Sequence, residues 1–180
     1  EGEKEASAAR QAKLALDIGC MIMEGEGIET ILEEAAHRNQ HRYLIVRSAW
    51  VYGIGRDFVS TVLNAAADPT CPWLAVPTDR FASPTSADDL TAAVEQLIDH
   101  DTLGIYHIVC QGCCSRYDFA QAILKAAHME DKLELHPIRA ADAGSTPSYT
   151  VLDNLMLRLD NLPQPRPWKE ALNEYINSLQ

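Results

Sequence analysis

Residues 43–60 read YLIVRSAWVYGIGRDFVS, a β-branched and aromatic run that ends in two glycines and an arginine. A continuous apolar run of this kind is typical of a strand covered on both faces in a parallel sheet. Gly53 and Gly55 then precede a helix expected from about Asp57 to Ala67. A dinucleotide-binding loop needs three glycines here, so that the backbone can approach a pyrophosphate at the helix N-terminus. With only two, the loop is predicted to turn the chain and not to form a cofactor site.

Outward from this stretch, helical and strand patterns alternate along the chain. A short strand at residues 73–76 is expected to complete one βαβ unit with the first strand and helix. Ser86 and Ser115 are each followed three residues later by an aspartate, a variant of the capping box that opens a helix. The pattern predicts an α/β fold with a parallel, Rossmann-like sheet and a small α-rich lobe built from the later segments. The other expected elements are one helix at 4–38 with a kink at Gly25 and Gly27, helices at 86–100, 115–128, 153–159 and 167–179, and strands at 104–109 and 132–138.

Composition limits the classes of partner. The chain has 180 residues, 47% of them hydrophobic, which is enough for one well-buried core. Its formal net charge of −11 argues against nucleic acid and anionic membrane surfaces as partners, because no basic stripe is present. No apolar run reaches the length of about 18 residues that a membrane span needs. Five cysteines, an odd number, favour a reducing compartment, so we expect a cytoplasmic protein.

A metal site is not expected. His107, Cys110, Cys113 and Cys114 lie close together in sequence. A structural zinc site normally takes a second ligand pair from elsewhere in the chain, and the segment is better explained by small buried residues between a strand and a capped helix.

Six segments carry a resemblance to a known family. As a set and in this order they resemble the later part of the dTDP-4-dehydrorhamnose reductases, which are extended short-chain dehydrogenases. The resemblance covers residues 18–177 and implies that residues 1–180 form a single partial domain that includes the substrate lobe, with the N-terminal half of the fold absent. The segments are YLIVRSAWVYG at 43–53, DFVSTVL at 57–63, TDRFASPTSADDL at 78–90, GIYHIVCQGCCSRYDFAQAI at 104–123, PSYTVLDN at 147–154 and RPWKEAL at 166–172.

The resemblance also implies where a ligand is held. These reductases bind NADPH through an N-terminal Rossmann half, and bind a thymidine-diphospho-sugar in a cleft against a small C-terminal lobe. The matching positions in this chain are therefore expected to face a sugar nucleotide. They are Arg47, Trp50, Tyr52, Arg56, Asp57, Arg80, Ser83 and Thr85.

The sequence departs from the family pattern at the positions of the catalytic residues. In the family a tyrosine donates the proton to the ketone and a lysine four residues later lowers the pKa of that tyrosine. Ile18 and Ile22 stand at these two positions, so no catalytic residue is expected in this chain. NADPH is implied for the complete family fold and no cofactor is expected in this chain. Three further family positions also differ: Asp57 replaces an asparagine, Arg80 a glutamine and Thr146 an arginine.

Two hypotheses follow. In the first, the chain is the sugar-nucleotide-binding portion of a dTDP-4-dehydrorhamnose reductase-like protein, active only with the missing half. In the second, it is a pseudoenzyme, a non-catalytic regulatory or interaction subunit similar to the regulatory subunit of methionine adenosyltransferase. Binding of a nucleotide-diphospho-sugar is expected to be weak or lost under either. The apolar strand at 43–52 should pair along its open edge with another polypeptide or a second copy, or be covered there by the N-terminal helix.

Overall fold

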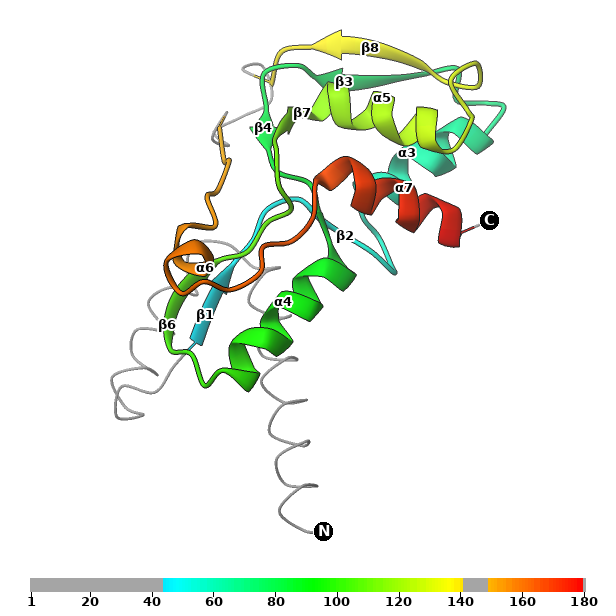
Figure 1. Cartoon of the computed structure of the whole chain (residues 1–180). Coiled ribbons are helices and arrows are strands. Elements are labelled where there is room, and N and C mark those ends of the chain that lie inside the picture. The colour runs from blue at the N-terminus through cyan, green and yellow to red at the C-terminus, as the bar shows by residue number, and fades with distance from the viewer. Residues whose placement is uncertain (1–43, 141–148, 180) are drawn as a thin grey trace.

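The computed structural model describes residues 44–140 and 149–179 (Figure 1). The helix expected at 4–38, together with Ile18, Ile22 and Thr146, lies outside these residues. The strands are β1 (Leu44–Arg47), β2 (Val51–Tyr52), β3 (Trp73–Pro77), β4 (Phe81–Ala82), β5 (Thr85–Ser86), β6 (Gly104–His107), β7 (Cys114–Ser115) and β8 (Glu134–Ile138). The helices are α3 (Phe58–Ala67), α4 (Ala87–Asp99), α5 (Arg116–Ala126), α6 (Leu155–Leu159) and α7 (Trp168–Ser178). No described helix has the length and apolar character that crossing a membrane requires.

The helix starts follow from local chemistry, as the sequence predicts. Asp57 caps α3: its carboxylate accepts the N–H of Ser60, and the Ser60 hydroxyl accepts the N–H of Asp57. Ser115 and Asp118 make the same reciprocal pair at α5. Such pairs satisfy backbone N–H groups that have no partner inside a helix.

The start of α4 departs from its prediction. Ser86 is the N-cap residue and its hydroxyl accepts the N–H of Asp88, but the expected box with Asp89 does not form. Instead, the carboxylate of Asp89 pairs with the guanidinium of Arg166 at 3.0 Å. A charged partner from a distant segment therefore replaces the local bond.

The single strand expected at 43–52 is wrong, because the chain bends inside it. Trp50 has a φ of 45°, in the left-handed region that a tryptophan rarely adopts. The bend divides the run into two short strands. β1 pairs in parallel with β6, whereas β2 pairs in parallel with β5.

The βαβ unit expected from strand 43–52, helix 57–67 and strand 73–76 is also wrong. β3 pairs in parallel with β8, from Trp73 opposite Glu134 to Pro77 opposite Ile138, and not with β1. The inner face of β3 packs on α5 and α3, which draws the strand away from β1. β4 and β7 form the one antiparallel pair among the described strands.

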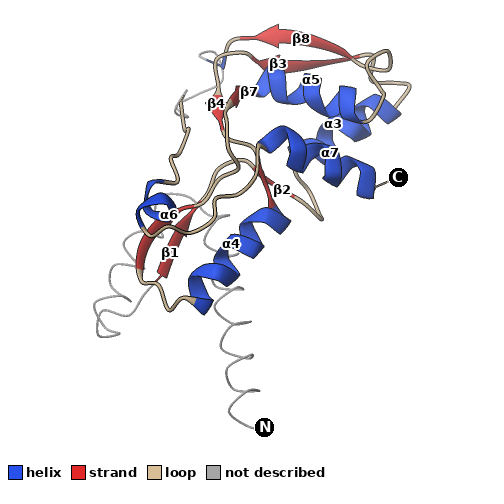
Figure 2. Ribbon diagram, in the orientation of Figure 1, coloured by secondary structure: helices blue, strands red, loops and turns tan. Residues whose placement is uncertain are grey.

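Among the described residues, apolar side chains form two buried clusters, and Figure 2 shows the helices and strands that carry them. One lies under the β3–β8 sheet among α3, α5 and α7, with Phe119 fully buried in it. The other joins β1 and β6 to α4 and α6 through residues such as Leu97 and Leu157. The first lobe is rich in helix, as expected, although it takes α3 and β3 from the middle of the chain. The short strands β2 and β5 connect the two parts.

Candidate functional site

The bend after β1 directs Trp50 toward the helical lobe. Its carbonyl oxygen accepts the N–H of Thr85, which ties the bend to the start of β5. The indole ring is half-buried and stacks on Phe119, with ring centroids 6.2 Å apart and planes 17° apart. A non-glycine residue with positive φ costs on the order of 1–2 kcal/mol, so contacts of this kind must hold the bend in place.

Arg116 lies against the same indole ring. Its guanidinium carbon is 4.0 Å from the ring centroid of Trp50 and 4.3 Å from that of Phe58. A guanidinium this close to the face of an aromatic ring is attracted by the electron density of that face. Burial lowers the pKa of Arg116 to about 10, so the side chain is still a cation at neutral pH.

Arg80 adjoins Arg116 through the backbone. The carbonyl oxygen of Arg80 accepts the N–H of Arg116 at 2.9 Å. The Arg80 side chain donates to the carbonyl oxygen of Ala140 at 3.4 Å, while the carboxylate of Asp79 accepts the N–H of Ala140 at 2.8 Å. We call Trp50, Phe58, Arg80 and Arg116 together the arginine–aromatic cluster.

In the glycine loop before α3, the backbone N–H groups of Gly53 and Ser60 donate to the side chain of Asp57. One carboxylate oxygen of Asp57 accepts the N–H of Ser60, and the other accepts the N–H of Gly53 at 2.8 Å. A β-carbon on Gly53 would come within 2.8 Å of that of Ala87, so this glycine allows α4 to approach. Gly55 has a φ of 128°, which an L side chain rarely adopts. A carboxylate at the helix start repels a phosphate, so this loop does not fit the pyrophosphate of NADPH.

Comparison with known proteins identifies the family. The model of the RmlD substrate binding domain matches residues 29–180. The chain belongs to this family. A relative from Bacillus subtilis, the spore coat polysaccharide biosynthesis protein SpsK, is 38% identical over 134 residues, which are 73% of this chain and 46% of that protein. The dTDP-4-dehydrorhamnose reductase of Mycolicibacterium smegmatis is 35% identical over 143 residues, 73% of this chain and 41% of that enzyme.

Solved structures of the RmlD family confirm the Rossmann-like α/β fold. A dTDP-4-dehydrorhamnose reductase from Clostridium acetobutylicum superposes with a TM-score of 0.76 at 37% identity, over 82% of this chain and 52% of that one. The Bacillus anthracis reductase, solved in complex with NADP, gives 0.75 at 30% identity, with the same two coverages. This chain therefore spans about half the length of the RmlD-family proteins that it matches.

The positions predicted for a sugar nucleotide in this RmlD-family chain separate into three groups. Trp50 and Arg80 both adjoin Arg116, the first through its ring and the second through its backbone, and Asp57 precedes Phe58 of the same cluster. Arg47 at the end of β1 and Arg56 in the glycine loop are exposed.

The other three predicted positions are buried. Tyr52 is 2% exposed, its ring packs on Phe119 and Tyr175, and burial raises its pKa far above the usual value. The hydroxyl of Thr85 donates to the carbonyl oxygen of Ser83 and accepts the N–H of Cys110. The structure gives these side chains a place in the interior, and their contact with a ligand stays a prediction.

Sequence reasoning missed Arg116. The signal was present, because a basic residue directly after the N-cap residue opposes the positive end of the helix dipole. A cation at this position therefore needs a compensating interaction. The two rings that do so come from the bend after β1 and the start of α3, which the sequence does not place beside α5.

The three cysteines around β7 differ in their exposure to solvent. Cys110 and Cys114 are buried, and burial raises their pKa to about 11 and about 12, so both remain thiols at neutral pH. Cys113 is exposed. Within residues 44–140 and 149–179, no three histidine, cysteine or acidic side chains converge as a metal site would require.

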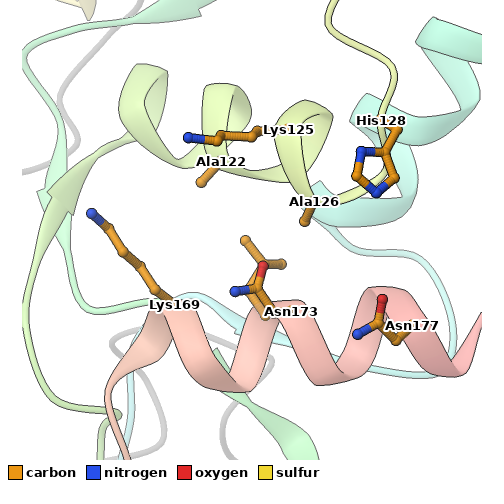
Figure 3. Close-up of a pocket in the computed structure, with 8 residues that line it drawn as sticks. Ala122, Lys125, Ala126, His128, Lys169, Asn173 and Asn177 are labelled. Atoms are coloured by element: carbon orange, nitrogen blue, oxygen red, sulfur yellow. The ribbon is translucent and has the colours of Figure 1, made fainter.

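An open groove of about 510 Å³ runs between α5 and α7 (Figure 3). Lys125 on α5 and Lys169 at the start of α7 lie on its two sides. All of its charged and amide side chains are exposed, so they carry no sign of a preorganised ligand site. The lining consists of Ala122, Lys125, Ala126, His128, Lys169, Leu172, Asn173 and Asn177.

Proposed function

We propose that this chain is the sugar-nucleotide-binding portion of a dTDP-4-dehydrorhamnose reductase-like protein and acts in nucleotide-sugar metabolism. The observation that carries the proposal is the contact between Trp50 and the guanidinium of Arg116, whose backbone is bonded to that of Arg80, in a chain of the RmlD family. A nucleotide-diphospho-sugar needs a flat apolar face for its base or sugar and fixed N–H donors for its diphosphate. The Arg116 guanidinium can supply such donors, and the half-buried indole of Trp50, which also contacts Phe119, adds an apolar surface beside them. A cytoplasmic location stays a prediction from the composition.

We further propose that this chain does not itself reduce a keto sugar. The resemblance puts Ile18 and Ile22 where the family has the tyrosine and lysine of proton transfer. General acid catalysis contributes about a hundred- to ten-thousandfold in rate.

Calorimetric titration with thymidine diphosphate tests the binding proposal. We expect weak, saturable heat for the wild-type chain, and affinity lowered about tenfold by Trp50→Ala or Arg80→Gln, which corresponds to about 1.4 kcal/mol. Lys132→Gln removes an exposed positive charge before β8, at the opposite end of that strand from Ala140, and is the matched control. Equal heats for the wild type and all three variants would exclude the cluster.

The catalytic proposal has a separate test. Incubation of the chain with NADPH and dTDP-4-dehydrorhamnose should leave the absorbance at the NADPH maximum unchanged. Steady NADPH oxidation that depends on the keto sugar would contradict the assignment of Ile18 and Ile22 to the catalytic positions.

We also propose that the edge of β1 pairs with another polypeptide or with a second copy of the chain. β1 is bonded to β6 on one side, and no other described strand bonds to it. Unpaired N–H and C=O groups on such an edge are a ready template for strand addition. Sedimentation at low micromolar concentration should show an assembly. A stable monomer in which residues 44–47 exchange amide hydrogens rapidly would contradict the pairing.

A further inference from the structure

Arg116 carries a positive charge that the fold holds but does not neutralise. Two other arginines form ion pairs with carboxylates. Arg158 pairs with Asp153 at 2.6 Å, and Arg166 pairs with Asp89 at 3.0 Å. Within residues 44–140 and 149–179, no carboxylate or carbonyl oxygen accepts a hydrogen bond from the Arg116 guanidinium. The chain has a net charge of −11, so acidic side chains are abundant, and an arginine that pairs with none of them is unexpected.

The acids next to Arg116 and Arg80 along the chain already have other hydrogen-bond partners. Asp118, two residues along α5, accepts the N–H and the hydroxyl of Ser115 in the helix cap. Asp79 accepts the N–H of Ala140, and this bond holds the pKa of Asp79 below its usual value. Neither carboxylate is a counter-charge for Arg116, so the aromatic rings are what stabilise the cation.

The contacts of the Arg116 guanidinium leave its N–H groups available to a ligand. Rings of Trp50 and Phe58 lie within 4.0 Å and 4.3 Å of its central carbon. Aromatic rings do not accept conventional hydrogen bonds, so these contacts leave the N–H groups of the guanidinium without an oxygen acceptor. The nitrogen atoms of Arg116 are not among the fully buried polar atoms that lack a partner, so solvent reaches them. An incoming anion would meet a fixed fork of donors.

We propose that Arg116 is the residue that binds the diphosphate of the sugar nucleotide, with Trp50 and Phe58 as positioning residues for its guanidinium. This inference rests on the proposed function and narrows it to one anion contact. Phosphate oxygens match the planar fork of an arginine in a bidentate pair. Because the rings fix the side chain beforehand, little conformational freedom is lost when the anion arrives.

The electrostatics agree with this assignment. Burial without a counter-charge lowers the pKa of Arg116 to about 10, which means that the cation is held at a free-energy cost. A bound phosphate would offset that cost. Arg116 would therefore contribute more to affinity than an arginine that already has an acidic partner.

The test uses calorimetry with three probes: thymidine diphosphate, thymidine and inorganic pyrophosphate. For Arg116→Gln we expect affinity for thymidine diphosphate and pyrophosphate to fall about 10- to 100-fold, the range for one charge-assisted bond, while thymidine is unaffected. Arg116→Lys keeps the charge but not the fork, and we expect an intermediate loss. Lys132→Gln again serves as the charge-matched control and should bind as the wild type does.

The outcomes separate the two proposals. If the wild type binds thymidine diphosphate and Arg116→Gln binds it equally well, the inference is wrong while the proposed function stands. If pyrophosphate binding depends on Arg116 but thymidine diphosphate binds no more tightly than pyrophosphate, the anion contact stands and the nucleotide proposal fails. Should Arg116→Gln not fold, as judged by circular dichroism, Arg116→Lys supplies the deciding comparison, and wild-type affinity in it would overturn the bidentate contact.

Discussion

Gly53 provides a sharp test of what the glycine loop is for. Substitution by alanine would place a β-carbon 2.8 Å from that of Ala87, closer than the 3.5–4.0 Å or so at which carbon atoms pack favourably. The backbone cannot easily withdraw, because the N–H of Gly53 donates to Asp57 at 2.8 Å and its carbonyl oxygen accepts the Tyr175 hydroxyl at 2.6 Å. We therefore expect Gly53→Ala to lower the free energy of unfolding by about 1–3 kcal/mol, the usual range for overpacking.

A second substitution isolates the cause. Ala87→Gly removes the opposing β-carbon and by itself should cost about 0.5–1 kcal/mol, as glycine does in a helix. In the double variant the clash is gone, so its loss of stability should be smaller than the sum of the two single losses by about 1–2 kcal/mol. Urea unfolding of the four proteins, followed by circular dichroism, measures this coupling.

The same experiment distinguishes packing from ligand binding. If Gly53 served to let a phosphate approach, the alanine variant would keep its stability and lose affinity for thymidine diphosphate. Strictly additive losses, or a Gly53→Ala variant as stable as the wild type, would refute the packing role and reopen the loop as a phosphate site.

Two further predictions follow from perturbed ionisable groups. The Tyr106 phenol donates to the carboxylate of Asp160, and burial raises its pKa from 10 to about 12. Tyr106→Phe should therefore be about 1 kcal/mol less stable than the wild type below pH 10, and this difference should vanish as the pH rises through 12; a difference that persists above pH 12 would contradict the assignment. Cys113 should react with a maleimide at pH 8 in the folded protein, whereas Cys110 and Cys114 should react only on unfolding; peptide mapping that finds all three labelled at one rate would contradict their burial.

Local chemistry made the first residues of α3, α4 and α5 predictable from the sequence. Asp57, Ser86 and Ser115 each begin a helix because a short polar side chain reaches backbone N–H groups two or three residues ahead. Such bonds depend only on neighbouring residues, so they are visible in a single sequence. The family resemblance likewise identified the RmlD family from the sequence, since it compares residue types in order, while the ligand contacts of Trp50 and Arg80 stay predictions.

The tertiary structure decided how those elements meet. Strand partners were not predictable, because β3 could satisfy its hydrogen bonds beside any parallel strand, and packing on α3 and α5 selected β8. The break at Trp50 depends on contacts with Thr85 and Phe119, which lie far along the chain. The charge on Arg116 has the same explanation: the sequence shows a basic residue at a helix start, but only the fold brings two aromatic rings to its faces and leaves no carboxylate within reach among the described residues. Electrostatic and stacking interactions act through space and carry no fixed spacing along the chain, and for that reason the anion contact became visible only in three dimensions.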